Sequence, residues 1–470
     1  MKIHNYKYLP AILALVALTS CKVGQNYRRP DLKMPEQFAG SEAKDSSIAD
    51  IPWSRFFEDA TLHQLIEKAI NENFDLQVAI KRTEVARLYL KQARLGMLPS
   101  LNLQATASST TPSKNSLNGL SLQNFLGTDH VEDYTVSGGL SWEADIWGKI
   151  RREKEATLAA YLQTSEAAKA VQTQVVANIA QGFYNLLMLD AQLEIAKKNL
   201  VLNDSTLQFT RLQRTAGEVT TLAVEQAEAQ KQSTALLVPQ LEQSIAEQEN
   251  ALSILTGSLP AEIGRTVKLS QFKTPATLAT GVPAAIVSRR PDVRANEMAL
   301  IAANANVGVA QAYMYPALNI TATGGLNSFK ASNWFNIPAS LFGMVAGSIT
   351  EPVLQHRQLK TQLEIAKIQR EQAVIQFRQS VLNAAGEVSN ALVATDKLKA
   401  QQQIASAQVD TLQHAIVNAR LLFRSGMANY LEVITAQGNV LQAELNLASV
   451  QRQQLGAMVE LYRSLGGGWK

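Results

Sequence analysis

The chain has 470 residues, of which 46% are hydrophobic and 18% are charged, and its formal net charge is +4. This near balance of charge, without a basic run that is interleaved with aromatic residues, argues against binding to nucleic acid. A single cysteine excludes an intrachain disulfide framework.

The N-terminal residues have the pattern of a secretory signal segment. A basic start precedes the apolar run 9–18, and small residues follow it. Residues 18–21 resemble the bacterial lipobox, in which the cysteine is lipidated and becomes the first residue of the mature chain. We therefore expect a signal peptide at 1–20 and a lipidated Cys21. Lys22 stands where many lipoproteins retained in the inner membrane carry an aspartate.

The next segments alternate between irregular and helical patterns. Residues 22–51 are polar and punctuated by prolines, which indicates either an extended arm or a disordered linker. Residues 61–97 carry an apolar stripe at helical spacing, and Pro99 ends the pattern.

Four segments of about ten residues alternate apolar and polar side chains, which is the period-two pattern of strands with two different faces. Loops rich in polar residues follow the first and the third segment, at 109–130 and 328–338. The alternation is poor only in the last segment. The four predicted strands are 101–108, 134–142, 318–327 and 341–350.

Most of the remaining chain is predicted to form long helices that reverse at glycines. Two hairpins result, 149–255 with its reversal at Gly217 and 353–465 with its reversal at Gly426. Pro239 is expected to kink or split the return helix of the first hairpin. Helices of this length favour coiled-coil packing or a helical barrel over a compact globule.

The two halves of the chain resemble each other. Residues 74–106 align without a gap on 291–323, and residues 211–227 align on 420–436. The shared order of an aspartate, a Met-x-Pro-x-Leu-Asn motif and a hairpin glycine argues against chance identities between Ala-rich helices. We infer a tandem duplication within one body, because the period is far too long for a solenoid.

The strands also limit how the chain can assemble. Amphipathic strands of this length span a bilayer, and unpaired strand edges are costly in lipid. Four strands cannot close a barrel, and eight would leave an interior that side chains fill. The small polar residues on one face favour a water-filled pore, and therefore at least three chains. A soluble four-stranded sheet packed on helices is the alternative.

Three motifs give the chain a family resemblance. They are Ser-Trp-Glu-Ala-Asp-Ile-Trp-Gly-Lys at 141–149, Ser-Arg-Arg-Pro-Asp-Val-Arg at 288–294 and Leu-Tyr-Arg-Ser-Leu-Gly-Gly-Gly-Trp at 461–469. The chain resembles the outer-membrane-factor family of TolC-like efflux ducts, in its lipoprotein NodT-type branch. The resemblance implies a mixed α/β membrane protein, a homotrimer whose chains each give four strands to a twelve-stranded β-barrel and long hairpins to a periplasmic α-barrel.

The resemblance also implies the function. It predicts a passive exit duct for drugs or other small molecules that lies in the outer membrane, among its lipids, and extends into the periplasm. The partners would be a periplasmic adaptor and an inner-membrane pump. The alternatives are a duct for peptide or protein secretion and a non-conducting anchored periplasmic scaffold.

The resemblance places functional residues at the hairpin tips. The tips would dock the adaptor, and an acidic residue just past the second glycine would form a ring at the periplasmic gate. Both glycines could instead serve only to end helices, and the acid could be an ordinary solvated side chain. The candidate docking residues are Gly217, Thr220, Thr221, Gly426 and Ala428, and the gate residue is Glu432.

No catalytic, metal or cofactor site stands out, because the five histidines are far apart in sequence and no phosphate-binding loop is present. We therefore expect a protein that is not an enzyme and that needs no cofactor. The predicted segments are the signal peptide 1–20, a lipidated arm 21–57, first-repeat helices 58–98, a strand hairpin with an extracellular loop 99–143, a helical hairpin 144–256, an equatorial linker 257–283, second-repeat helices 284–315, a second strand hairpin with an extracellular loop 316–351, and a second helical hairpin with the C-terminal end 352–470.

Overall fold

The computed structural model describes residues 23–32, 47–272 and 283–470. The predicted signal peptide and Cys21 lie outside the described residues, as do parts of the arm and of the linker between the repeats. The chain divides into two compact units. The first contains Val85–Leu162 and Met298–Ile375 together with the beginning of the described chain, and the second contains most of the remaining helical segments.

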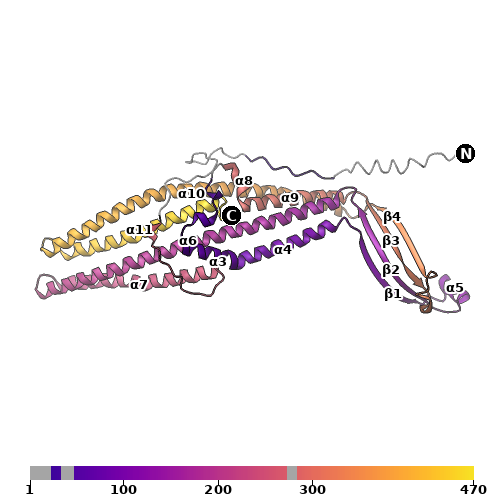
Figure 1. Cartoon of the computed structure of the whole chain (residues 1–470), viewed down its shortest axis with the longest axis horizontal. Helices are drawn as coiled ribbons and strands as arrows, with labels where there is room; N and C mark the ends of the chain where they lie inside the picture. The colour runs from indigo at the N-terminus through magenta and orange to yellow at the C-terminus, as the bar shows by residue number, and fades with distance from the viewer. Residues whose placement is uncertain (1–22, 33–46, 273–282) are drawn as a thin grey trace. The chain divides into compact units, whose positions relative to one another are not determined.

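A four-stranded antiparallel sheet forms one part of the first unit (Figure 1). Its strands follow one another in chain order, so that β2 and β3 are central and β1 and β4 are the edges. All four predicted strands are confirmed, the first three with extra residues at their ends. They are β1 (Ser100–Thr110), β2 (Val131–Ala144), β3 (Ala317–Ser328) and β4 (Leu341–Thr350).

The strand register keeps one polar and one apolar face across β1, β2 and β3, whereas Phe342 and Met344 of β4 lie opposite Gly325 and Thr323 on the polar face. Cross-strand partners share a face, so equal polarity at paired positions extends each face from strand to strand. Apolar pairs include Leu101–Leu140, Val136–Leu326 and Trp142–Ile320, and polar pairs include Thr106–Thr135, Thr135–Asn327 and Ser141–Thr321.

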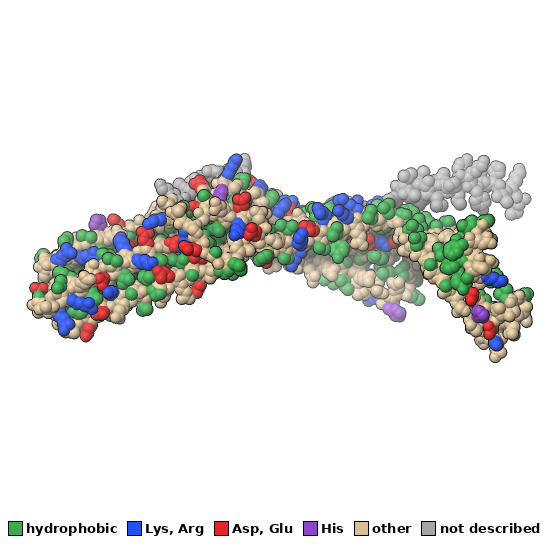
Figure 2. Space-filling view, turned by 60° about the horizontal axis from the view of Figure 1, so that its bottom comes forward, with side chains coloured by type: hydrophobic (Ala, Val, Ile, Leu, Met, Phe, Trp, Pro, Cys, Tyr) green, Lys and Arg blue, Asp and Glu red, His purple; other side chains and the backbone are tan. Residues whose placement is uncertain are grey.

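Charged side chains are nearly absent from the sheet. Strands β1, β3 and β4 contain none, and β2 carries acids only near its ends, at Glu132, Asp133 and Glu143. Figure 2 shows hydrophobic surface over the sheet, whereas charged side chains are spread over the helices. Exposed Leu103, Val345 and Ile349 belong to this apolar surface.

The 109–130 segment, predicted to be a loop, contains a short helix, α5 (Leu117–Phe125). Ser116 caps it, since its hydroxyl accepts a hydrogen bond from the amide of Gly119 at 3.1 Å. The loop prediction was therefore wrong over these residues. The composition is poor in strong helix formers, and a local cap overrides that signal.

The 141–149 motif joins the sheet to the first long helix. The carboxylate of Asp145 accepts hydrogen bonds from the amides of Ile150 and Arg151 at 2.9 and 3.2 Å and so caps that helix. The Trp147 indole stacks on Tyr315 with ring centroids 4.8 Å apart. The motif therefore fixes the angle between strand and helix.

The helices repeat with equal lengths in the two halves of the chain. Helices α4 (Phe74–Leu95) and α9 (Pro291–Ala312) both have 22 residues. The long helices α6 (Lys149–Thr215) and α10 (Gln358–Arg424) both have 67 residues, and the return helices α7 (Thr221–Leu255) and α11 (Tyr430–Ser464) both have 35. The predicted internal repeat is confirmed.

Short helices connect these parts within the second unit. They are η2 (Ile48–Asp50), α2 (Trp53–Phe56), α3 (Ala60–Glu72), η3 (Leu269–Gln271), η4 (Pro283–Ala285) and α8 (Ile286–Arg289), and η5 (Ala331–Asn333) lies in the first unit between β3 and β4. Among the described residues, no helix combines the length and the apolar character needed to cross a membrane.

One helix prediction was wrong, and one of the two effects expected of Pro239 does not occur. The predicted helix 61–97 breaks at Asn73, whose side chain accepts from the amide of Leu76 and donates to the carbonyl of Leu255 at 2.9 Å. Helix α7 is not split by Pro239, which is exposed and lies inside a continuous helix. The helix continues through Pro239 although the proline removes one backbone hydrogen bond.

Candidate functional site

The reversals of the two helical hairpins lie side by side in the second unit (Figure 1). The amide of Gln437 on α11 donates to the hydroxyl of Thr206 on α6 at 2.8 Å and so links the two hairpins near their tips. Both reversals contain a glycine in the left-handed region, with φ +82° at Gly217 and φ +74° at Gly426.

Both glycines end their helices in the same way. The amide of Gly217 donates to the carbonyl of Arg214 at 3.0 Å, and the next amide, of Glu218, donates to Gln213 at 3.0 Å. At the second tip the same two bonds join Gly426 to Phe423 and Met427 to Leu422, at 3.2 and 2.9 Å. This pair of bonds is the Schellman motif, which requires a positive φ at the glycine.

The return helices begin with side-chain caps. The hydroxyl of Thr220 accepts from the amide of Ala223 at 3.4 Å. At the second tip Asn429 accepts from the amide of Glu432 at 3.2 Å, and the Glu432 carboxylate accepts from the amide of Asn429 at 3.5 Å. This capping box gives Glu432 a structural role, and sequence reasoning missed Asn429, although Asn followed by Glu three residues later is its signal.

The candidate docking residues differ in exposure. Gly217, Thr220, Thr221 and Gly426 are exposed, whereas Ala428 is half-buried. Its methyl group packs on an apolar cluster formed by Ile416, Phe423, Val433 and Val440. Met427, next to it, is 73% exposed and is the more accessible residue of the second tip.

The side-chain contacts between the two helices of a hairpin differ between the first and the second hairpin. In the first, Arg211 pairs with Glu228 at 2.9 Å. The repeat places Arg420 and Gln437 at the matching positions of the second hairpin, so that the acid is missing there. Nη2 of Arg420 is buried without a hydrogen bond in the described part of the chain, and its burial, with a contribution from the Arg424 charge, lowers the pKa of Arg420.

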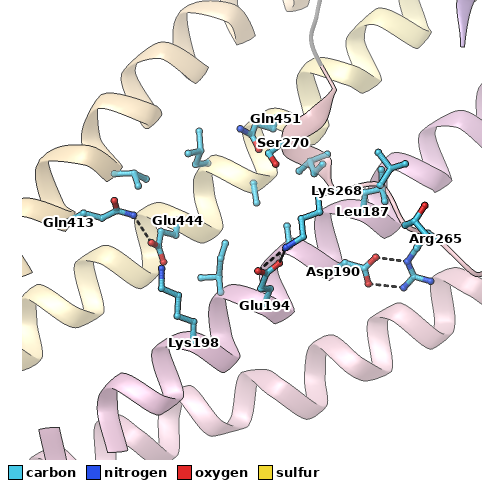
Figure 3. Close-up of a pocket in the computed structure, with 18 residues that line it drawn as sticks. Leu187, Asp190, Glu194, Lys198, Arg265, Lys268, Ser270, Gln413, Glu444 and Gln451 are labelled. Carbon is cyan, nitrogen blue, oxygen red and sulfur yellow. Dashed lines mark hydrogen bonds and ion pairs between the residues drawn. The ribbon is translucent and has the colours of Figure 1, made fainter. Parts of the chain in front are cut away.

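A cavity of about 510 Å³ lies between α6, α10, α11 and the segment 265–270 (Figure 3). Ion pairs from this segment to α6 form part of its polar lining. Arg265 donates from Nη2 to the Asp190 carboxylate at 2.7 Å, and Lys268 pairs with Glu194 at 2.8 Å. These pairs fasten the segment that connects the two repeats to helix α6.

The described residues contain no group of three or more His, Cys, Asp or Glu side chains that could hold a metal ion. The capped tips are the exposed polar arrangement of the second unit in which the predicted site residues meet. Their exposed surface consists of backbone and small side chains together with two acids, Glu218 in the first reversal and Glu432 at the start of α11.

Comparison with known proteins agrees with this architecture. The chain matches the family described as outer membrane efflux protein over residues 65–258 and 282–467. It is 30% identical to the cation efflux system protein CusC of Escherichia coli O6:H1 over 472 aligned positions, which cover 99% of both chains. It is 28% identical to the probable outer membrane lipoprotein SilC of Salmonella typhimurium, covering 98% of both.

Solved structures give the same result. The crystal structure of CusC superposes with a TM-score of 0.84 at 29% identity and covers 95% of this chain and 100% of that one. The open state of the Neisseria gonorrhoeae MtrE outer membrane channel superposes with a TM-score of 0.86 at 25% identity, covering 96% and 99%. The chain belongs to the outer membrane efflux protein family, and it is an efflux protein of the outer membrane.

Proposed function

We propose that three copies of the chain form the exit duct of a tripartite efflux system. The observation that carries this proposal is the sheet itself, with four amphipathic strands and two free edges, β1 and β4. Pairing β4 of one copy with β1 of the next leaves no edge in lipid, and three copies give a twelve-stranded barrel with room for a lumen. The apolar face meets lipid, and the polar face of Ser, Thr, Asn and Gly lines the water-filled path.

The tips are the proposed docking surface for a periplasmic adaptor, which connects the duct to an energised inner-membrane pump. Exposed Gly217, Thr220, Thr221 and Gly426 leave room for the close approach of a partner helix. The duct moves its cargo without chemical change. The pump, rather than the duct, selects the cargo. The segment boundaries predicted from the sequence, including the equatorial linker 257–283, belong to this proposal.

The test is photo-crosslinking in cells from Thr221 and Met427, with captured proteins identified by mass spectrometry. We expect one periplasmic adaptor at both positions and none at Leu382, a 71% exposed control position on α10 that is remote from the tip. Capture of neighbouring copies alone would leave a channel without an efflux partner, and the proposal would fail.

We further propose that three Glu432 carboxylates form a ring at the periplasmic gate and attract cations. Glu432→Gln should lower the cation selectivity of the open channel, measured as a reversal potential in planar bilayers under a salt gradient. Glutamine keeps the capping box with Asn429, so a folding defect is not expected. The control is Glu225→Gln, an exposed acid on α7. Equal cation selectivity in wild type and Glu432→Gln would contradict the proposed role of Glu432 at the gate.

Cys21 is the proposed site of lipidation. Cys21→Ala should weaken anchoring but leave the trimer folded, because the strands still insert into the bilayer by their apolar faces. The measurement is the amount of heat-labile trimer in outer-membrane fractions, alongside metabolic labelling with palmitate. Complete loss of the barrel after this change would contradict the expectation.

A further inference from the structure

An arginine buried in the first turn of α6 holds the beginning of the described chain. The Arg152 side chain is 1% exposed, and it donates from Nε to the carbonyl of Val23 at 3.3 Å and from Nη2 to the carbonyl of Gly24 at 2.9 Å. Its charge is balanced by Glu155 at 2.8 Å. The amide of Val23 in turn donates to the carbonyl of Trp147 at 3.3 Å.

Two glycines and an asparagine complete this contact. Gly24 has φ +85°, and a Cβ there would lie 2.8 Å from Cα of Gly308 on α9. A Cβ at Gly308 would lie 3.0 Å from Nε of Arg152. Asn304, also on α9 and 8% exposed, donates to the carbonyl of Gln25 at 3.0 Å. Three successive backbone carbonyls are therefore bound by buried side chains.

We propose that Arg152, Asn304 and Gly308 form a clasp that binds the backbone of the first residues after the lipidated cysteine. Burying a guanidinium is costly unless its donors are satisfied in a defined geometry, so a passive tether would not need one. Because the clasp binds backbone carbonyls, its contacts depend on the backbone conformation of the arm at Gly24 more than on the side chains of the arm. The proposed role in anchoring rests on the proposed lipidation of Cys21.

The clasp determines where the lipid anchor can lie. Cys21 is three residues before Gly24, so their Cα atoms are at most about 11 Å apart. Helix α6 starts just after β2, and α9 ends just before β3, the two central strands of the sheet. Gly24 is therefore held near the end of the sheet where the central strands meet α6 and α9, away from the edges β1 and β4. A lipid on Cys21 would be attached within that distance of Gly24.

The test is hydrogen–deuterium exchange of residues 23–27 in the full-length, lipidated protein in detergent. Arg152→Met removes the two carbonyl contacts, so the segment should open more often. We therefore expect exchange of the Val23 amide, which donates to the carbonyl of Trp147, to be about tenfold faster or more. Lys154→Met, an exposed lysine on the same helix, should leave exchange unchanged. Gly24→Ala disturbs the clasp from the arm side only, so it serves as the test if Arg152→Met does not fold.

The outcomes separate the clasp from the lipidation. Exchange in Arg152→Met or Gly24→Ala equal to that in Lys154→Met would overturn the clasp and leave the lipidation of Cys21 untouched. Absence of palmitate from the wild-type protein would overturn the position of the anchor together with the lipidation, while the protection of residues 23–27 would still support the clasp.

Discussion

Replacing Gly426 with proline is expected to abolish efflux while the protein remains assembled in the outer membrane. Gly426 has φ +74°, and proline is confined to about −65°. Proline also lacks the amide that donates to Phe423 in the helix-ending motif. No heavy atom lies within 4 Å of the position of a Cβ at Gly426, so the damage stays local to the tip.

The measurement is drug susceptibility and dye accumulation in cells that have this chain as the only duct for the pump. Gly426→Ala keeps the amide and retains only the strain of a positive φ, about 1–2 kcal/mol, so a partial defect is expected. Gly386→Ala is the control, because that glycine lies inside α10 with open space at its Cβ. Normal efflux with proline at 426 would argue against docking at the tips.

Much of this fold could be predicted from local sequence patterns. Period-two alternation predicted β1, β2 and β3, whereas β4 was predicted correctly in spite of its poor alternation. The duplicated motif predicted that α4, α6 and α7 recur as α9, α10 and α11. Such patterns can be interpreted because the spacing of apolar residues shows which face of a strand or helix each residue occupies. The glycines at 217 and 426 could also be predicted from local sequence, because the tight reversal of a helical hairpin requires a positive φ whatever the helices pack against.

The failures of prediction have a different cause. Asn73 breaks a helix because its side chain reaches the carbonyl of Leu255, and Arg152 is buried because it holds Val23. Both contacts join residues more than a hundred positions apart, and no local pattern encodes them. The same holds for Arg290, which the sequence marked only as part of a conspicuous Arg-Arg-Pro-Asp motif.

The Arg290 side chain is 4% exposed and is the centre of an ion-pair network. It donates to both carboxylate oxygens of Asp292, at 3.0 and 2.6 Å, to Glu387 at 2.8 Å and to the carbonyl of Ser464 at 3.1 Å. Pro291 begins α9. The network thus joins the start of α9 to α10 and to the end of α11.

Replacing Arg290 with methionine is therefore expected to destabilise the protein strongly. The change leaves Asp292 and the carbonyl of Ser464 without this donor, whereas Glu387 keeps its pair with Arg463 at 3.0 Å. Because both carboxylates are partly exposed, we expect a cost of about 2 kcal/mol.

The control is Arg289→Met, since Arg289 is more exposed and its ion pair among the described residues is with Asp50 at 2.9 Å. A change below about 1 kcal/mol is expected for this control. The measurement is thermal unfolding of the solubilised protein at pH 7, and equal melting temperatures for the two variants would contradict the role of the network.

The same network predicts how stability depends on pH. Burial of the Asp292 carboxyl acts to raise its pKa, but the hydrogen bonds and charge of Arg290 outweigh this and hold the pKa below its usual value. A depressed pKa in the folded state gives stability that is fully present above the unfolded value, about 3.9, and that is lost as the pH falls through the folded value. Acidification below about pH 4 should therefore destabilise wild type more than Arg290→Met, so the gap between their melting temperatures narrows. A gap that stays constant from pH 7 to pH 3 would show that Asp292 does not take its low pKa from Arg290.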